Sequence, residues 1–282
     1  MVTPFEPDGA LDLDAARRVA RHLVDSGSHG VVLAGTTGES PTLSDDEVVR
    51  LLDTTLDEIG DEATVICGTG SNNTRHTAGL TRKAADVGAH AALVVTPYYN
   101  RPNRAGILAH YAAVAEGGGD LPIVLYNIPS RTALNLPPDL LAELAATIDP
   151  IVAVKQANDD ELGPIEGLTI LAGNDNTFAR TLAFGGAGGI LVASHLVGAR
   201  MRELYEAAIA GDHDRAAEID AELTPVYEAT AVTNPIPVKT GLELLGVADA
   251  IFRLPLVQAS DEERERVRTA LEGAGVLAEA RS

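Results

Sequence analysis

The segment Ile151-Val152-Ala153-Val154-Lys155 decides the fold class of this chain of 282 residues. Its four apolar residues, three of them β-branched, predict a strand buried on both faces, as in a parallel sheet covered by helices. Lys155 is then expected where the strand ends. In parallel α/β folds this is the edge at which functional groups collect.

Short apolar runs of the same kind recur along the chain and alternate with amphipathic stretches. This alternation predicts parallel strands joined by right-handed crossovers. With Val2 to Phe5 as an eighth strand, it predicts an α/β fold, the (β/α)8 TIM barrel. The other strands are predicted at 30–34, 64–68, 91–96, 123–127, 151–155, 169–172 and 189–193. Helices are predicted between them at 12–26, 45–59, 74–87, 104–116, 138–147 and 176–184.

After Ala193 the chain carries only helical patterns. We therefore expect two parts, a barrel over 1–211 and a C-terminal helical bundle over 212–282 that extends it. The helical stretches of this region are predicted at 201–210, 213–231, 237–245 and 260–271.

The composition excludes several classes of partner. The net charge is −20, which repels nucleic acid and anionic membranes, so neither is an expected partner. No stretch approaches the roughly 20 apolar residues of a membrane span, and the first residues do not resemble a signal peptide, so the cytoplasm is the expected location. The single cysteine, Cys67, is expected to be a core thiol. His195 has no second ligand at metal-binding spacing, so no metal is expected.

Lys155 carries the strongest chemical signal. It is one of only three lysines in the chain. An amine held against apolar side chains loses hydration, and this favours the free base, which can attack a carbonyl and form a Schiff base. The alternative is a lysine that extends past the strand end into water.

Polar residues also follow other predicted strands. Gly35-Thr36-Thr37-Gly38-Glu39-Ser40 offers hydroxyls and amides for a small carboxylate, but lacks the lysine and spacing of a P-loop. Thr96 to Asn100 and Tyr126 to Arg131 add tyrosines and an arginine. A single tyrosine would more simply pack at an interface. Together, a phenol and hydroxyls that relay a proton and an arginine that grips a carboxylate predict a catalytic site around Lys155.

In this order, the motifs resemble those of the dihydrodipicolinate synthase and N-acetylneuraminate lyase superfamily. The resemblance covers nearly the whole chain. Thr37 and Arg131 resemble the synthase branch rather than the sialic acid lyases. The motifs are GTTGES (35–40), TPYYNRP (96–102), YNIPSRT (126–132), AVKQA (153–157), AGND (172–175) and NPIPVK (234–239).

The resemblance implies a Schiff-base lyase that needs no metal or other cofactor. It would condense pyruvate with L-aspartate 4-semialdehyde to 4-hydroxy-tetrahydrodipicolinate, in lysine and diaminopimelate biosynthesis. Lys155 would be the nucleophile and Tyr126 the proton donor and acceptor above it. Thr36 and Tyr99 would complete the proton relay.

The resemblance also implies four substrate-binding residues. Thr37 would hold the pyruvate carboxylate, and Arg131 the carboxylate of the semialdehyde. Gly173 would present a backbone carbonyl near the aldehyde, and Ile190 would line the pocket. The usual assembly of the family is a dimer of dimers, in which Tyr98 or Tyr99 reaches across a tight contact, so a homotetramer is expected.

Two departures from the family pattern bear on specificity. Gln156 stands where glutamate is usual, and the segment 158–167 is short, which leaves the preferred aldehyde open. The residues that bind feedback lysine in relatives correspond to Asp45, Val48, Asn72 and His76. With histidine in place of a glutamate that would pair with the amine, lysine inhibition is predicted to be weak or absent.

Two other functions stay open at this stage. The first is a pyruvate-dependent aldolase or dehydratase acting on a 2-keto sugar acid, against which Arg131 argues. The second is a non-catalytic paralogue that only binds a keto acid. The intact set Lys155, Tyr126, Thr36 and Tyr99 argues against it, because a binding protein has no need of a proton relay.

Overall fold

The computed structural model describes residues 1–279. The chain divides into two compact units, one formed by Val65–Leu191 and the other by Met1–Thr64 together with Val192–Ser282. The last three residues of the predicted helical bundle, 280–282, lie outside the described part. Within residues 1–279, no helix is both long enough and apolar enough to cross a membrane.

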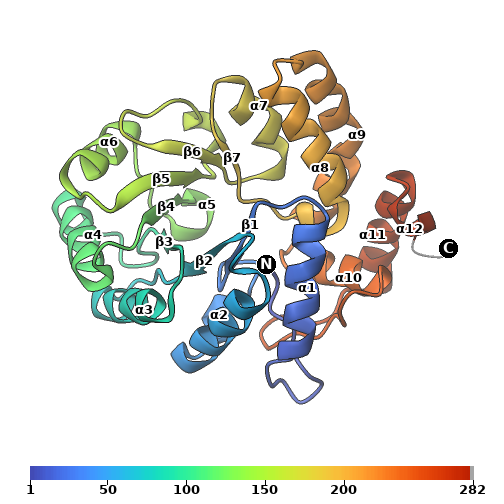
Figure 1. Cartoon of the computed structure of the whole chain (residues 1–282), viewed down its shortest axis with the longest axis horizontal. Coiled ribbons are helices and arrows are strands. Elements are labelled where there is room, and N and C mark those ends of the chain that lie inside the picture. Colours follow the sequence, from blue (N-terminus) through green and yellow to red (C-terminus); the bar gives the residue numbers. More distant parts are fainter. Residues whose placement is uncertain (280–282) are drawn as a thin grey trace. The chain divides into compact units, whose positions relative to one another are not determined.

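Parallel strands follow the order of the chain in one seven-stranded sheet (Figure 1). In Val65–Leu191 each strand pairs with the next in parallel, for example Ala92 with Ile123 and Tyr126 with Lys155. Parallel pairing follows from the intervening helix, which returns the chain to the same end of the sheet. The strands are β1 (Gly30–Leu33), β2 (Thr64–Gly68), β3 (Ala91–Val95), β4 (Ile123–Asn127), β5 (Ile151–Gln156), β6 (Thr169–Ala172) and β7 (Gly188–Gly189).

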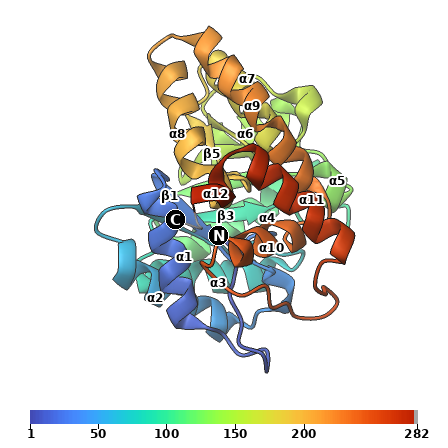
Figure 2. The ribbon, with the colours of Figure 1, turned by 90° about the vertical axis from the view of Figure 1, so that its right-hand side faces the viewer.

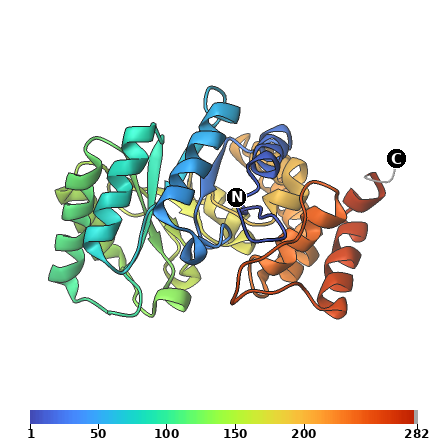
Figure 3. The ribbon, with the colours of Figure 1, turned by 90° about the horizontal axis from the view of Figure 1, so that it is seen from below.

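The helices of Val65–Leu191 begin and end at clear local signals. Asn73 and Asn103 accept hydrogen bonds from the first turns of α3 and α4, and Gly88 ends α3 with a left-handed residue. Helices α3 and α4 lie side by side (Figure 3). A Cβ at Gly117 would lie 2.6 Å from the Ala78 carbonyl oxygen, so glycine permits this close approach. The helices are α3 (Thr74–Val87), α4 (Arg104–Gly118), α5 (Pro129–Thr132), α6 (Pro138–Thr147) and α7 (Phe178–Ala183).

The second unit combines β1 with helices from both ends of the chain. From Ser194 to Glu279, helices are the only regular elements, as the sequence predicted. Helix α9 packs against α8 and α11, and α11 against α10 (Figure 2). The helices of this unit are α1 (Leu13–Asp25), α2 (Asp45–Ile59), α8 (Ser194–Ile209), α9 (His213–Ala231), α10 (Ile236–Leu244), α11 (Asp261–Gly273) and α12 (Val276–Glu279).

The prediction of a strand at Val2 to Phe5 is wrong. This segment is buried but forms no ladder, and Phe5 makes only an isolated bridge to Leu11. Its polar groups form hydrogen bonds to distant segments instead of to a neighbouring strand. The Val2 N–H donates to the His195 ring at 3.2 Å, and the Thr3 hydroxyl donates to the Gly38 carbonyl at 2.6 Å. The closed eight-stranded barrel and the boundary at 212 stay predictions.

Two further predictions need correction. The strand predicted at 189–193 ends at Gly189, although the Ile190 N–H still reaches the Ala172 carbonyl at 2.9 Å. The chain then turns into α8, which begins at Ser194 rather than at 201. Strand β5 is not buried on both faces throughout, because Val152 is 44% exposed near its start. The helices predicted at 45–59, 74–87, 138–147 and 213–231 are confirmed in their bounds.

Candidate active site

Strands β4 and β5 bring Tyr126 and Lys155 together. The two residues are partners in the parallel register and therefore point to the same face of the sheet. The Lys155 ammonium nitrogen lies 4.3 Å from the centroid of the Tyr126 ring. Tyr126 is 5% exposed, whereas Lys155 is half-buried and thus open to a small molecule. An amine and a phenol stand side by side at the carboxyl ends of two strands.

The Tyr126 backbone is held from the neighbouring strand. Its carbonyl accepts hydrogen bonds from the Thr96 N–H at 3.1 Å and from the Thr96 hydroxyl at 3.0 Å. Thr96 is fully buried, so these bonds are shielded from water. The phenol is thereby anchored by its main chain as well as by packing.

Gly173 and Ile190 also lie at strand ends. The Gly173 N–H donates to the Gln156 carbonyl at 2.8 Å. A Cβ at Gly173 would lie 2.6 Å from the Cβ of Ala157 and 2.7 Å from that carbonyl oxygen, so only glycine fits. Ile190 extends the ladder by one residue through its bond to Ala172. Both residues lie at the end of the sheet at which β5 carries Lys155.

Two predicted site residues are exposed. Tyr99 is 88% exposed and has a φ of 70°, an unfavourable conformation for an aromatic residue. A ring so exposed is not packed into the site of its own chain. Arg131 lies on the one-turn helix α5, where it is exposed to solvent.

Thr36 and Thr37 belong to the other unit, in the turn that follows β1. Ala34 and Glu39 both have positive φ, at 49° and 55°, and the Glu39 N–H closes the turn on the Thr36 carbonyl at 3.1 Å. The Thr37 hydroxyl accepts a hydrogen bond from the Asn234 side chain at 3.0 Å. The turn is therefore a defined structure rather than a loose loop.

Glu39 anchors this turn to helix α10. Its side chain is fully buried and lies 2.5 Å from the Lys239 ammonium nitrogen. Lys239 also donates to the Ile251 carbonyl at 2.5 Å and lies over the rings of Phe5 and Phe252. Burial lowers the pKa of Lys239, while Glu39 opposes that shift. These contacts give Lys239 a structural role in this unit.

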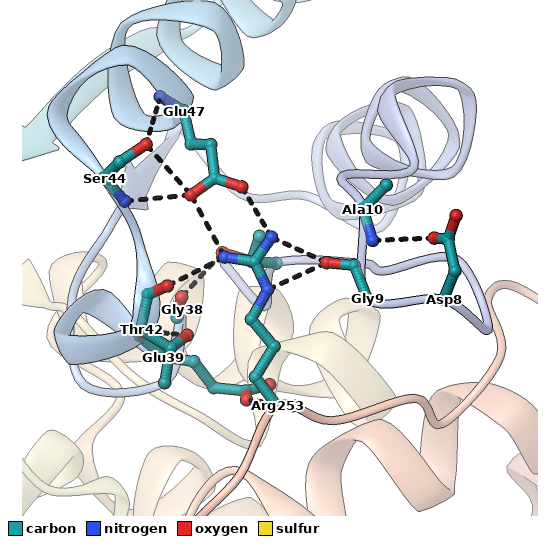
Figure 4. A network of polar contacts seen from close by, with 10 residues as sticks. Asp8, Gly9, Ala10, Gly38, Glu39, Thr42, Ser44, Glu47 and Arg253 are labelled. Carbon is teal, nitrogen blue, oxygen red and sulfur yellow. Dashed lines mark hydrogen bonds and ion pairs between the residues drawn. The ribbon is translucent and has the colours of Figure 1, made fainter.

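Arg253 extends the same network (Figure 4). Its backbone N–H donates to Glu39 at 3.2 Å, and its guanidinium pairs with both carboxylate oxygens of Glu47, at 2.5 and 3.1 Å. It also donates to the carbonyls of Gly9 and Thr42. The hydrogen bond from the Arg253 side chain is the main cause that lowers the pKa of Glu47 to about 2. One guanidinium thus links the N-terminal loop at Gly9 to the segment that follows the turn, at Thr42 and Glu47.

Sequence reasoning missed the residues that support the site. Glu39 and Asn234 stand inside quoted motifs, which was the one available signal. Asn127 and Gln156 also stand inside quoted motifs, but their roles, like that of Arg253, depend on contacts between distant segments.

His195 and Cys67, for which the sequence predicted no catalytic or metal-binding role, are both buried. The His195 ring nitrogens lie within hydrogen-bonding distance of the Val192 carbonyl, at 2.8 Å, and of the Val2 N–H, and burial lowers its pKa to about 3. Burial raises the pKa of the Cys67 thiol to about 12. Across residues 1–279 there is no group of three or more histidine, cysteine or carboxylate side chains placed to hold a metal.

Comparison with known proteins agrees with the motifs at the strand ends. The sequence model of the dihydrodipicolinate synthetase family matches residues 1–274. The chain belongs to this family. A relative from Symbiobacterium thermophilum, described as 4-hydroxy-tetrahydrodipicolinate synthase, is 48% identical over 98% of this chain and 97% of its own length. A relative of the same description from Methanospirillum hungatei is 44% identical over 96% of each chain.

Solved structures of the family share the fold. Dihydrodipicolinate synthase from Thermotoga maritima is 37% identical, with a TM-score of 0.94 over 98% of this chain and 97% of the other. The enzyme from Aquifex aeolicus has a TM-score of 0.93 at 37% identity, over 98% and 96%. The prediction of a lyase of lysine and diaminopimelate biosynthesis is confirmed by these relatives.

Proposed function

We propose that this chain condenses pyruvate with L-aspartate 4-semialdehyde through a Schiff base at Lys155. The observation that carries the proposal is the placement of the Lys155 amine against the Tyr126 ring at the ends of β4 and β5. We further propose that the sheet belongs to a (β/α)8 barrel over 1–211, with residues 212–282 as its helical extension.

The proposed reaction begins with attack of the free Lys155 amine on the C2 carbonyl of pyruvate. The carbinolamine loses water to give an iminium, and a proton then leaves the methyl carbon to give an enamine. The enamine carbon attacks the aldehyde, whose oxygen takes up a proton. The amino group of the second substrate then attacks C2, closes the ring and releases Lys155. Tyr126 is the proposed donor and acceptor of these protons, and no metal or other cofactor takes part.

Four residues are proposed to hold the substrates. Thr37 binds the pyruvate carboxylate through its hydroxyl and amide, and Arg131 binds the carboxylate of the semialdehyde with its planar fork. Gly173 offers its carbonyl beside the aldehyde, and Ile190 lines the pocket. The family member from Acinetobacter baumannii, solved as a complex with pyruvate, supports the assignment of the first substrate.

Thr36 and Tyr99 are proposed to complete the proton relay. Because Tyr99 is 88% exposed in the single chain, we propose that it works in an assembly, with a partner subunit covering it. A homotetramer is the proposed assembly and the cytoplasm the proposed location. A monomeric variant is described among the related structures.

Reduction with borohydride in the presence of pyruvate tests the covalent step. The expected result is a stable adduct on Lys155, located by mass spectrometry, and none in Lys155→Ala. Full turnover by a correctly folded Lys155→Ala variant would overturn the proposal. A panel of aldehydes offered with pyruvate then separates the semialdehyde from 2-keto sugar acid chemistry, which Gln156 keeps open.

A further inference from the structure

We propose that Gln156 is a positioning residue that fixes the loop carrying Arg131 and thereby sets the affinity for the second substrate. This inference rests on the proposed function, in which Arg131 grips the carboxylate of the aldehyde substrate. The inference adds that side-chain amides on the face of the sheet opposite Lys155 determine how well Arg131 is placed to bind that carboxylate.

The loop that carries Arg131 is closed by the side chain of Asn127. Its oxygen accepts from the Leu136 N–H at 3.0 Å, and its amide nitrogen donates to the Leu136 carbonyl at 3.3 Å. Inside this ring, the Thr132 hydroxyl donates to the carbonyls of Ile128 and Leu134. Asn127 is fully buried, so the ring forms away from water. The backbone of Arg131 is thus held from both ends of its loop.

Gln156 ties this ring to strand β5. Its side-chain oxygen accepts from the Asn127 amide at 2.9 Å and from the Asn158 N–H at 3.1 Å. Asn135 joins the same group, because its oxygen accepts from Asn127 at 2.9 Å and from Asn158 at 3.1 Å. The Asn135 amide donates in turn to the Glu161 carboxylate. The loops after β4 and β5 are therefore linked through one side chain.

The directions of these bonds are fixed by groups that can only donate or only accept. The Leu136 and Asn158 N–H groups are donors, and an ionised Glu161 is an acceptor. They set the orientation of Asn127, Gln156 and Asn135 in turn. The orientation leaves the Gln156 amide nitrogen without a hydrogen-bond partner, although the residue is only 1% exposed.

An unpartnered buried amide nitrogen costs stability. Both hydrogen bonds that Gln156 makes in the network go to its side-chain oxygen, so the oxygen is the group that links the two loops. Successive residues of a strand point to opposite faces, so Gln156 lies behind Lys155 and away from the substrate. Its influence on the reaction must pass through the Arg131 loop.

The test is the variant Gln156→Leu, which keeps similar bulk and removes the acceptor. The KM for the semialdehyde is expected to rise about tenfold, because the Asn127 amide and the Asn158 N–H both lose their acceptor. The KM for pyruvate and the borohydride adduct at Lys155 are expected to be unchanged. The matched control is Gln258→Leu, the same substitution at an exposed position, which should leave all constants unchanged.

A second variant supplies the rescue. Gln156→Glu keeps the acceptor oxygen and replaces the unpartnered amide nitrogen with a second oxygen, so its KM for the semialdehyde should stay close to that of the original enzyme. A glutamate variant as impaired as the leucine variant would contradict the proposal. If Gln156→Leu does not fold, Asn135→Ala, at a half-buried position, breaks the same network and should give the same KM pattern.

A double-mutant cycle decides whether Gln156 acts through Arg131. In an Arg131→Ala background, Gln156→Leu should no longer change kcat/KM for the semialdehyde. Full additivity, or an equal rise in the KM for pyruvate, would overturn the inference. Failure of the proposed function is distinguishable, because it would appear as the absence of a pyruvate adduct at Lys155 in the unaltered enzyme.

Discussion

Lys239 and Glu39 form a buried ion pair across 200 residues of sequence, with 2.5 Å between the ammonium nitrogen and the carboxylate oxygen. Glu39 closes the turn that carries Thr36 and Thr37, and Lys239 lies on α10. The turn after β1 therefore takes its shape from the C-terminal helices. This gives those helices a part in organising residues proposed to bind pyruvate.

Removal of one partner of this pair should be strongly destabilising. Lys239→Met leaves the Glu39 carboxylate buried without its cation, which typically costs about 3–5 kcal/mol. Urea denaturation measures the change in the free energy of unfolding. The same substitution at the exposed Lys83 is the control and should change it by less than about 0.5 kcal/mol. A loss below about 1 kcal/mol for Lys239→Met would show that the pair is not the anchor.

Tyr126→Phe separates the role of the phenol hydroxyl from that of the aromatic ring. The ring that lies under the Lys155 amine is kept, while the hydroxyl proposed to move protons is lost. We expect kcat to fall about 10²–10⁴-fold, the usual contribution of an acid–base group, while borohydride still traps the pyruvate adduct. Tyr205→Phe removes a tyrosine hydroxyl on α8 that has no proposed role in the reaction, and it should leave kcat unchanged. Equal kcat values in the two variants would remove Tyr126 from the mechanism.

Acid should destabilise the fold through His195. Burial lowers its folded pKa from 6.5 to about 3, so the folded state holds it neutral. The resulting stability is fully present above pH 6.5 and is lost as the pH falls from there toward 3, because the unfolded chain takes up the proton first. The maximal slope is about 1.4 kcal/mol per pH unit. Between pH 6 and pH 4, the free energy of unfolding of His195→Gln should fall less steeply than that of the original protein, because about one proton fewer is taken up on unfolding. Denaturation curves at each pH measure this difference. Parallel curves for the two proteins would contradict this account.

Lysine is expected to leave turnover unchanged at submillimolar concentration. The family resemblance of the sequence implies that a carboxylate holds the lysine amine in inhibited relatives, and His76 stands at the corresponding position here. A structure from Cyanidioschyzon merolae is described with lysine bound, so the family can carry such a site. Steady-state rates with added lysine provide the measurement. His76→Glu is the informative variant, since a gain of inhibition would identify the missing partner.

Local sequence signals placed most elements to within two residues of their observed bounds. Ser44 with Glu47 forms the capping box that starts α2, and the helix ends at Ile59 as its periodicity predicts. The prediction failed where tertiary contacts replace a ladder. Val2 to Phe5 has the apolar composition of a strand, yet the Val2 N–H is bonded to the distant His195 side chain. Strand β7 is likewise cut short where the chain turns into α8.

The sequence by itself determined the alternating α/β architecture, the family and the candidate residues at the strand ends, because these follow from periodicity and short motifs within a few residues of one another. Only the tertiary structure decided that Tyr126 is the register partner of Lys155, that Glu39 pairs with Lys239, and that Gln156 bonds to Asn127. Contacts of this kind join segments tens to hundreds of residues apart. They depend on how strands and helices are brought together in space, and no local spacing encodes that.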